Sequence, residues 1–586
     1  MSDTAIAVRG WSDRLRDIAG SIGHAETHHP VPRPEDYRHP WEAAYPTDVD
    51  WRIALTPGTM TALFDRAVET YADQTCLEFF GKRRSYRETG AMVARAAKGL
   101  IELGVGKGVR VGLFLPNCPY YVICYHAVLQ AGGTVVNFNP LYAETGIARQ
   151  IRDADVRIMV TMNLGTLYPK IEGRLNDTGL ERIVVCSMSA ALPFPGNAFF
   201  ALFKQRETSA YPADDRHAKF ENLVGNDGEF EAPEIAPDDI TLLQYTGGTT
   251  GTPKGAMLSH ANLYANTMQT RSWAPGILDG QEKFLAVLPL FHVFGMTGVM
   301  NVGLNIGAEI QLLPRFKVTE VLKAVDKSRP TVLMGVPTMF SALNGSPETE
   351  KFDLSSLKFC ISGGAPLPLE VKTTFEEIAG CTLVEGYGLT EAAPVCTINP
   401  IGALNKPGSA GLPIPGTVIE IVSLDDPHLL VATGEKGEIC VTGPQVMQGY
   451  WMQKEESETA LEDGRLHTGD VGHIDEDGYV FISDRIKDLI ITGGFNVYPR
   501  MVEEAVQHHP AVDDVAVCGV PSSHHGEIVK AFVALRPGEK IKAAELRAFL
   551  KTRLASFETP RRIQFVKAIP KTMLGKPLRR ELVARE

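Results

Sequence analysis

Apolar residues recur along the chain with two periods, one helical and one strand-like, and stretches of the two kinds alternate. Helical spacing fills residues 60–71 and 88–103, whereas short β-branched and apolar runs at 109–115 and 156–160 are typical of buried strands. The same alternation continues to about residue 400. Because a crossover helix commonly joins neighbouring parallel strands, this order predicts βαβ units around a largely parallel sheet.

The pattern changes from Gly408 onward, where strand-like runs become shorter and turns more frequent. This change predicts a β-rich subdomain. Residues 501–566 then carry helix and strand patterns sufficient for a small α+β core of their own. We therefore expect an N-terminal extension over 1–56, a large N-terminal domain over 57–484 and a small C-terminal domain over 485–586.

Two segments allow more than one interpretation. The extension is polar, and although His24 and His28 have a spacing that would suit a metal on a helix, a solvated segment is the favoured interpretation. A short aromatic cluster could touch lipid or an acyl chain, but it is too short to anchor the protein. Local core or loop packing is the favoured interpretation for its members, Phe194, Phe199, Phe200 and Phe203.

Composition excludes several classes of protein. A chain of 586 residues is too long for one core, and its net charge of −12 argues against binding nucleic acid or anionic membranes in general. Nine cysteines are scattered singly without metal-ligand spacing, which is typical of buried thiols in a reducing compartment. No apolar run has the length of a signal peptide core or a membrane span. We expect a cytoplasmic enzyme, monomeric or homodimeric, with at most peripheral membrane contact.

The most informative stretch is Tyr245-Thr-Gly-Gly-Thr-Thr-Gly-Thr-Pro-Lys-Gly255, between a strand pattern and a helix start at Ser259. Glycines let backbone N–H groups converge on phosphate oxygens, while threonine hydroxyls add donors and Lys254 adds a mobile positive charge. The Walker spacing is absent, because Lys254 lies between a proline and a glycine. The sequence therefore predicts a phosphate loop of another type.

Further candidate residues follow along the chain. His292 comes just after a strand pattern at 284–288, where ligands of α/β sheets gather. Tyr387 lies between glycines and can offer its ring to a base, and Glu391 offers the oxygen ligands that Mg²⁺ prefers. Asp470, in Leu466-His-Thr-Gly-Asp470, can accept hydrogen bonds from both hydroxyls of a ribose.

Taken in order, these motifs resemble those of the adenylate-forming enzymes, which comprise acyl-CoA synthetases, luciferases and peptide-synthetase adenylation domains. The resemblance runs from about residue 59 to the C-terminus, where Lys576 matches the terminal catalytic-lysine motif of the family. The stretches most similar to bacterial long-chain fatty-acid–CoA ligases are Asn139-Pro-Leu-Tyr142, Gly386-Tyr-Gly-Leu-Thr-Glu391, Gly443-Pro-Gln-Val-Met447, Gly449-Tyr-Trp451 and Gly494-Phe-Asn-Val-Tyr-Pro499.

The resemblance implies a fold of mixed α/β and α+β class, with mostly parallel αβ layers, a β-rich subdomain and a mobile C-terminal domain. It implies that a medium- to long-chain fatty acid is joined to coenzyme A through an acyl-adenylate, with ATP and Mg²⁺. A dicarboxylate or aryl acid as substrate, transfer of the acyl group to a carrier protein, and a non-catalytic acyl or nucleotide binding protein stay open as alternatives.

The resemblance also implies roles for individual residues. Lys576 is expected to bridge the carboxylate and the α-phosphate, and His292 to line the acyl carboxylate pocket. Glu391 and Thr246 are expected to hold Mg²⁺, and Lys487 to be the hinge beside a coenzyme A channel at Gly493 and Gly494.

Two larger sets complete the expected site. The expected ATP contacts are Thr246, Gly247, Gly248, Thr249, Thr250, Gly251, Lys254, Gly364, Ala365, Gly386, Tyr387, Gly388, Thr390, Asp470 and Arg485. The expected acyl pocket is apolar and small, without a lysine or arginine, and comprises His292, Val293, Phe294, Met296, Val336 and Gly363.

Overall fold

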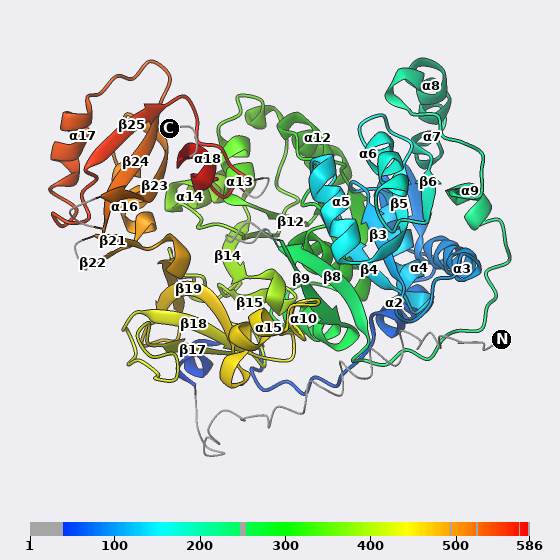
Figure 1. Ribbon diagram of the computed structural model, residues 1–586, viewed down its shortest axis with the longest axis horizontal. Coiled ribbons are helices and arrows are strands. Elements are labelled where there is room, and N and C mark those ends of the chain that lie inside the picture. Colours follow the sequence, from blue (N-terminus) through cyan, green and yellow to red (C-terminus); the bar gives the residue numbers. More distant parts are fainter. Residues whose placement is uncertain (1–38, 247–252, 493–494, 523–525, 573–574, 584–586) are drawn as a thin grey trace, which may run out of the picture.

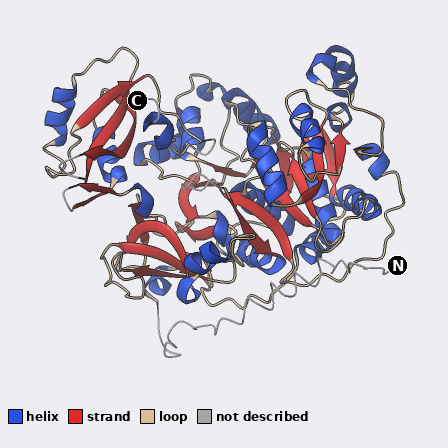
Figure 2. Ribbon diagram, viewed as in Figure 1, coloured by secondary structure: helices blue, strands red, loops and turns tan. Residues whose placement is uncertain are grey.

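The computed structural model describes residues 39–246, 253–492, 495–522, 526–572 and 575–583. Figures 1 and 2 show a large body of helices and strands, a β-rich part beside it and a small C-terminal unit. Residues 1–38, and with them His24 and His28, lie outside the described residues. The same is true of seven predicted site residues, namely Gly247, Gly248, Thr249, Thr250, Gly251, Gly493 and Gly494.

One sheet of the large body has the strand order β7-β6-β5-β3-β4-β8-β9. Its strands pair in parallel except for β9, which pairs antiparallel with β8. The strands are β3 (Arg110–Phe114), β4 (Thr134–Asn137), β5 (Val156–Met162), β6 (Arg182–Cys186), β7 (His217–Lys219), β8 (Ile240–Thr246) and β9 (Lys254–Ser259). The helices of this part are α3 (Tyr86–Glu102), α4 (Pro119–Gln130), α5 (Glu144–Asp153), α6 (Tyr168–Glu172) and α10 (His260–Ser272).

The second sheet has the order β16-β15-β14-β13-β12-β10-β11-β1-β2, with a parallel centre and antiparallel strands at both ends. Its strands are β1 (Thr75–Phe79), β2 (Lys82–Ser85), β10 (Lys283–Ala286), β11 (Glu309–Leu312), β12 (Val332–Gly335), β13 (Phe359–Ser362), β14 (Thr382–Gly388), β15 (Val395–Ile398) and β16 (Leu412–Pro413). Its helices are α2 (Met60–Thr70), α11 (Val302–Asn305), α12 (Val318–Ser328), α13 (Pro337–Asn344) and α14 (Leu369–Ala379).

Local sequence explains where several helices begin and which of them are buried. Ser85 starts α3 with a capping box, because its hydroxyl accepts from the Glu88 amide at 3.1 Å while its own amide donates to the Glu88 carboxylate at 2.8 Å. Ser259 caps α10 in the same way with Asn262. Helix α4 is apolar on all sides and buried over almost its whole length, as expected of a helix between two layers. One continuous apolar core joins both sheets.

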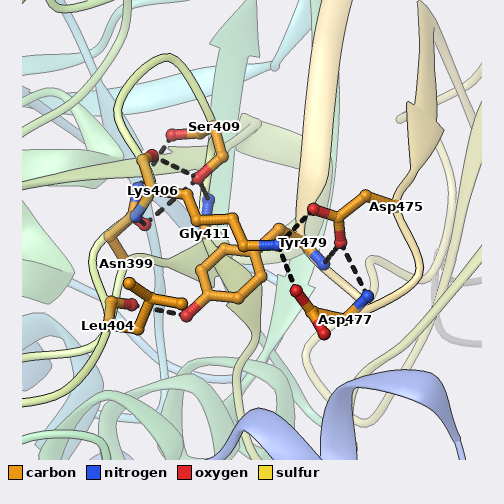
Figure 3. A network of polar contacts seen from close by, with 8 residues as sticks. All are labelled: Asn399, Leu404, Lys406, Ser409, Gly411, Asp475, Asp477 and Tyr479. Carbon is orange, nitrogen blue, oxygen red and sulfur yellow. Dashed lines mark hydrogen bonds and ion pairs between the residues drawn. The ribbon is translucent and has the colours of Figure 1, made fainter.

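The β-rich part is an antiparallel sheet, β17-β18-β19-β20, as the closely spaced turns predicted. It comprises β17 (Val418–Val422), β18 (Gly437–Thr442), β19 (Leu466–Ile474) and β20 (Val480–Arg485), with α15 (Lys454–Ala460) beside it. Figure 3 shows how its last turn is fastened to the second sheet: Lys406 pairs with Asp475 at 2.5 Å and with Asp477 at 2.6 Å. The Lys406 ammonium also lies 4.5 Å from the ring centroid of Tyr479.

The C-terminal unit has its own apolar core, which centres on valines such as Val502, Val506 and Val517. Its sheet runs β22-β21-β24-β23, with β25 pairing in parallel with β24. Both helices and strands occur in the range 501–566, as the sequence pattern predicts. The elements are β21 (Ile490–Thr492), β22 (Phe495–Val497), α16 (Pro499–Gln507), β23 (Val512–Ser522), β24 (Gly526–Leu535), α17 (Ala543–Leu550), β25 (Arg562–Val566) and α18 (Arg579–Val583).

The described part of the predicted extension is packed, which corrects the expectation of a solvated segment there. Trp41 is only 2% exposed and stacks on His39, with ring centroids 4.4 Å apart. Trp51 donates from its indole N–H to the Thr417 carbonyl. Gly478 adopts φ +85°, and a Cβ there would lie 2.3 Å from the Trp41 amide nitrogen. Trp41 and Trp51 therefore pack against the β-rich part of the molecule and its approach, at Gly478 and Thr417.

The phenylalanine cluster is a second correction, because most of it is exposed. Phe194, Phe199 and Phe203 are 83%, 58% and 71% exposed. They lie on or just before α8 (Gly196–Phe203), which follows α7 (Met188–Ala191), precedes α9 (Phe220–Leu223) and stands out from the large body in Figure 1. Local core packing is therefore wrong for these side chains. None of the helices within the described residues combines the length and the apolar character needed to cross a bilayer.

Replacing Trp41 with alanine tests how far the N-terminal segment supports the fold. We expect Trp41→Ala to lower the free energy of unfolding by about 3 kcal/mol, because it leaves a cavity under the last β-rich turn. Urea titration followed by far-ultraviolet circular dichroism measures the change. The matched control is Phe203→Ala, which removes an exposed ring and should change stability by less than about 0.5 kcal/mol. Equal effects of the two substitutions would contradict the structural role of Trp41.

Candidate active site

A cavity of about 1250 Å³ lies where the two α/β sheets, the β-rich sheet and the C-terminal unit meet. Most of the predicted site residues that the structure describes line it, although they come from distant parts of the chain. They are Thr246, Lys254, His292, Val293, Phe294, Gly363, Gly364, Gly386, Tyr387, Gly388, Thr390, Glu391, Arg485, Lys487 and Lys576.

The glycine-rich stretch connects the two strands of a hairpin. Thr246 ends β8 and pairs with Lys254, the first residue of β9. A strand and not a helix therefore begins at the lysine, as the failure of the Walker spacing predicted. The outer edge of β9 is covered by residues 449–451, because Met257 donates its amide to the Gly449 carbonyl at 2.9 Å and Trp451 donates to the Gly255 carbonyl at 2.7 Å. The hairpin is thus held on both sides.

A tyrosine that the sequence reasoning left without a role joins the hairpin to the acidic motif. The Lys254 ammonium lies 4.9 Å from the ring centroid of Tyr450. The Tyr450 hydroxyl donates to one carboxylate oxygen of Glu391 at 2.8 Å. Thr246 and Thr390 bring hydroxyl oxygens to the same cavity. This set of carboxylate and hydroxyl oxygens fits a hard cation such as Mg²⁺, which takes one or two carboxylates and leaves the remaining positions to water and phosphates.

Asp470 lies at the junction of the β-rich sheet and the second α/β sheet. Its carboxylate accepts from the Tyr387 hydroxyl at 2.7 Å and pairs with the Arg485 guanidinium at 2.9 Å. Asp470 and Arg485 are direct partners across β19 and β20, whereas Tyr387 comes from β14. Burial and the adjacent Asp470 charge raise the pKa of Tyr387, so this hydroxyl stays a donor. Asp470 thereby fixes the orientation of the Tyr387 ring beside the cavity.

His292 follows β10 and its side chain is neutral near pH 7. Burial lowers its pKa to about 4. The Phe294 amide donates to Nδ1 at 3.3 Å, so the ring proton is assigned to Nε2. His292 therefore offers the cavity a neutral N–H donor, which can bind a carboxylate oxygen without carrying charge.

The apolar wall next to His292 differs in part from the expected one. Met296 and Val336 are fully buried and do not line the cavity; the Met296 sulfur instead accepts from the Asn137 amide at 3.8 Å. Gly298 and Met334 line the cavity in their place, and a Cβ on Gly298 would lie 2.8 Å from the Met334 sulfur.

The backbone explains this exchange of residues. Residues Gly295–Asn301 form a π-helical turn, in which successive side chains are rotated differently from those of an α-helix. Two of the remaining predicted ATP contacts, Ala365 and Asp470, do not line the cavity. Asp470 is connected to it through its partners Tyr387 and Arg485, which do.

Lys576 reaches the cavity from a tight turn of the C-terminal unit. The Thr572 amide donates to the Lys576 carbonyl at 2.8 Å, and Gly575 has φ +78°. A Cβ on Gly575 would lie 2.8 Å from the Thr338 methyl group, so the turn comes into close contact with α13. Burial, with a smaller contribution from the Arg485 charge, lowers the pKa of Lys576 to about 8.

Arg579, which sequence reasoning missed, anchors this turn. Its guanidinium pairs with Asp488 at 2.9 Å and with Glu503 at 2.7 Å, and its Nε donates to the Val517 carbonyl at 2.8 Å. Asp488 directly follows the expected hinge residue Lys487. The segment that carries Lys576 is therefore tied to the start of the C-terminal unit by one side chain.

A C-terminal unit that brings a lysine into a cavity built by the rest of the chain is the arrangement of a two-domain nucleotide-dependent enzyme. The chain belongs to the AMP-binding enzyme family: the sequence profile of that family matches residues 64–451, and the profile of its C-terminal domain matches residues 501–576.

Named relatives agree with this assignment. A long-chain-fatty-acid–CoA ligase of Bacillus subtilis (strain 168) is 44% identical over 551 residues, which covers 93% of this chain and 98% of the relative. A protein of the same name from Escherichia coli O157:H7 is 35% identical over 92% of this chain and 97% of its own length. Among solved structures, ATP-bound MatB from Rhodopseudomonas palustris matches with a TM-score of 0.79 and 29% identity, over 90% of this chain and 99% of that chain.

The titration of Lys576 provides a test of the site geometry that needs no substrate. Competitive labelling with an amine-reactive reagent across pH, read by mass spectrometry, should give Lys576 a midpoint near 8. Arg485→Gln should raise this midpoint, because a nearby positive charge is removed. Lys98 is the internal control, since its hydrogen bond to Asp227 raises its pKa above the ordinary lysine value. A midpoint for Lys576 equal to that of Lys98 would contradict its placement in the cavity.

Proposed function

We propose that this protein is an AMP-forming acid–thiol ligase that joins a medium- to long-chain fatty acid to coenzyme A at the expense of ATP. The observation that carries the proposal is the position of Lys576, which enters the same cavity as the ends of the β8–β9 hairpin, His292 and Arg485, the partner of Asp470. Membership of the AMP-binding enzyme family supports it, as do the names of the relatives.

The reaction has two balanced steps. In the first, a carboxylate oxygen of the acid attacks the α-phosphorus of ATP, the bond to the pyrophosphate oxygen breaks, and an acyl-adenylate and pyrophosphate are formed. In the second, the thiol of coenzyme A attacks the acyl carbon, and AMP leaves with the electron pair while the thiol proton is released. The first step brings two anions together, so positive charge and oriented donors are what lower its barrier.

The cationic side chains indicate which part of the cavity would bind the phosphates of ATP. The hairpin residues Lys254 and Thr246 would hold the β- and γ-phosphates. Protonated Lys576 would bind one oxygen of the acid and one of the α-phosphate, which sets the attacking geometry. Mg²⁺, when held by Glu391 and Thr246, supplies charge neutralisation for the departing pyrophosphate.

Asp470 and its partners indicate which part of the site would bind the ribose and adenine of ATP. The Asp470 carboxylate retains lone pairs beyond those used by Tyr387 and Arg485, and these would accept from the ribose hydroxyls. The Tyr387 ring, held in place by its hydroxyl, would stack on the adenine. The small residues Gly363 and Gly364 line the cavity next to it and let a flat base approach.

The acid end is the wall around His292. Its neutral Nε2–H would donate to the acid carboxylate, while Phe294, Gly298 and Met334 present apolar surface to the hydrocarbon. The lining residues of this wall include no cation for a second carboxylate, and the names of the relatives favour a fatty acid over a dicarboxylate or an aryl acid.

The second step requires Lys576 to leave, because the thiol must approach the acyl carbon. We infer that residues 485–586 rotate about Lys487 as one domain against residues 57–484, which opens a channel past Gly493 and Gly494. Lys487 lines the cavity, and its neighbour Asp488 is tied to Arg579, so a rotation there would move Lys576. Cytoplasmic location and a monomeric or homodimeric state remain predictions from the sequence.

Removing the Lys576 amine should separate the two steps. We expect Lys576→Ala to slow acyl-adenylate formation about 10² to 10³-fold, because one preorganised charge is lost, while thioester formation from a supplied acyl-adenylate continues. ATP–pyrophosphate exchange measures the first step, and thioester formation from synthetic acyl-adenylate measures the second. The control is Lys571→Ala on the same turn, which loses only a pair with Asp514 at 2.7 Å. An equal loss in both steps would overturn the role of Lys576.

The size of the side chain at position 298 should set the accepted chain length. We expect Gly298→Met to reduce kcat/KM for a C16 acid at least tenfold more than for a C6 acid, because a Cβ there lies only 2.8 Å from the Met334 sulfur and both side chains must then take up cavity volume. The assay is acid-dependent AMP release across C6 to C18 fatty acids, a C7 dicarboxylate and benzoate. Gly106→Met is the control, since no atom lies within 4 Å of a Cβ there. A preference of the unaltered protein for benzoate or the dicarboxylate would overturn the proposed substrate.

A further inference from the structure

Three potential metal ligands from two strands meet beside the active-site cavity. Cys440 on β18 is the direct cross-strand partner of His467 on β19, and Glu438 lies two positions before Cys440 on the same strand, across a register shift. Their ligand atoms all lie within 4.8 Å of one another. The proposed reaction gives none of these side chains a role.

The distances suit a tetrahedral cation. His467 Nδ1 lies 3.5 Å from the Cys440 sulfur and 2.9 Å from a Glu438 oxygen. With Zn–S of about 2.3 Å and Zn–N of about 2.0 Å, a tetrahedral angle separates sulfur and nitrogen by about 3.5 Å. The carboxylate oxygen would have to move away from the nitrogen by only about 0.4 Å to take its own position.

The surroundings hold the three side chains in place. Cys440 is 1% exposed, and the side chains of His467 and Glu438 are 11% and 12% exposed. The second oxygen of Glu438 accepts from the Gly469 amide at 2.9 Å, and the Thr468 hydroxyl donates to the Ile439 carbonyl at 2.7 Å. These bonds fix the backbone on both strands, which is the support that ordered metal ligands require.

We infer that Glu438, Cys440 and His467 form a binding site for a soft divalent cation of the zinc class, with three protein ligands and one position open to the cavity. A thiolate and an imidazole select zinc-like ions over Mg²⁺, which prefers oxygen ligands only. Glu438 and His467 line the cavity, so water can reach the fourth position. The site is distinct from the Mg²⁺ ligands proposed above, because it shares no residue with them.

Binding has a defined proton balance. In the metal-free protein the Cys440 sulfur carries its thiol proton, and His467 Nδ1 carries the proton of its hydrogen bond to Glu438. The cation replaces the thiol proton, which leaves to solvent, and the His467 proton moves from Nδ1 to Nε2 through exchange with solvent, so that Nδ1 can coordinate. The hydrogen bond between His467 and Glu438 is thereby replaced with two coordination bonds. The step needs no oxidant or reductant.

Equilibrium dialysis of the reduced full-length protein with Zn²⁺, after chelator treatment, tests the site. We expect the unaltered protein to bind one Zn²⁺ that Cys440→Ala binds at least tenfold more weakly. The control is Cys396→Ala, which removes another buried thiol and should leave zinc affinity unchanged. Because surface histidines can also bind zinc, the variants are compared at equal protein and metal concentration. Equal affinities of the Cys440→Ala variant and the unaltered protein would overturn the site.

Co²⁺ in place of Zn²⁺ gives a second measurement, which reports the ligands directly. A thiolate-to-cobalt charge-transfer band is expected in the unaltered protein and in Cys396→Ala, and it should be absent in Cys440→Ala and weakened in His467→Asn. Circular dichroism of each variant establishes that it is folded. If Cys440→Ala does not fold, Cys440→Ser replaces it, and loss of the sulfur band with retained fold is the expected result. Absence of the band from the unaltered protein would overturn the proposal.

Discussion

The contacts of the Asp470 carboxylate are the interactions on which the arrangement of the active site depends. Asp470 and Arg485 face each other on β19 and β20 of the β-rich sheet, Arg485 is the last residue before the C-terminal unit, and Tyr387 belongs to the second α/β sheet. Two separately built parts therefore meet at one carboxylate, next to the start of a third. A buried carboxylate without its partners would be strongly destabilised, so this junction favours a single relative placement of the parts. The same guanidinium contributes to the lowered pKa of Lys576, and the junction thus reaches the reacting end of the site.

The proposed binding of a polyphosphate depends on cationic side chains that gather in the cavity. The protein as a whole carries a net charge of −12, yet Lys254, Arg485 and Lys576 all line one cavity. Without a ligand, burial and the neighbouring guanidinium make the charged form of Lys576 less favourable. A bound polyphosphate would reverse this effect, because an adjacent anion favours the protonated amine. Anion binding and protonation of Lys576 are therefore coupled. A bound polyphosphate would favour the protonated lysine, which is the form that the proposed first step uses.

The β-rich sheet does more than carry Asp470. The strand pair β18–β19 also brings together Glu438, Cys440 and His467, and Glu438 holds the Gly469 amide next to Asp470. A cation held there would act on the same short segment that carries Asp470. The exposed helix α8 contrasts with this built site, since its phenylalanines project from the body and nothing in the structure shows what covers them.

Local sequence determined the class of each element and the family, because periodicity and motif order are properties of neighbouring residues. The parallel α/β layers, the β-rich part and the absence of a helix start at Lys254 could be predicted in this way, whereas strand β9 was not. Residues whose environment depends on distant strands could not. In the π-helical turn Gly295–Asn301, Met296 points into the core and Gly298 lines the cavity. The packing of Trp41 depends on Gly478, which is more than 400 residues away. Cys440 and His467 have no metal-ligand spacing along the chain; only the register of β18 against β19 made them neighbours, because cross-strand pairing is decided by the whole sheet.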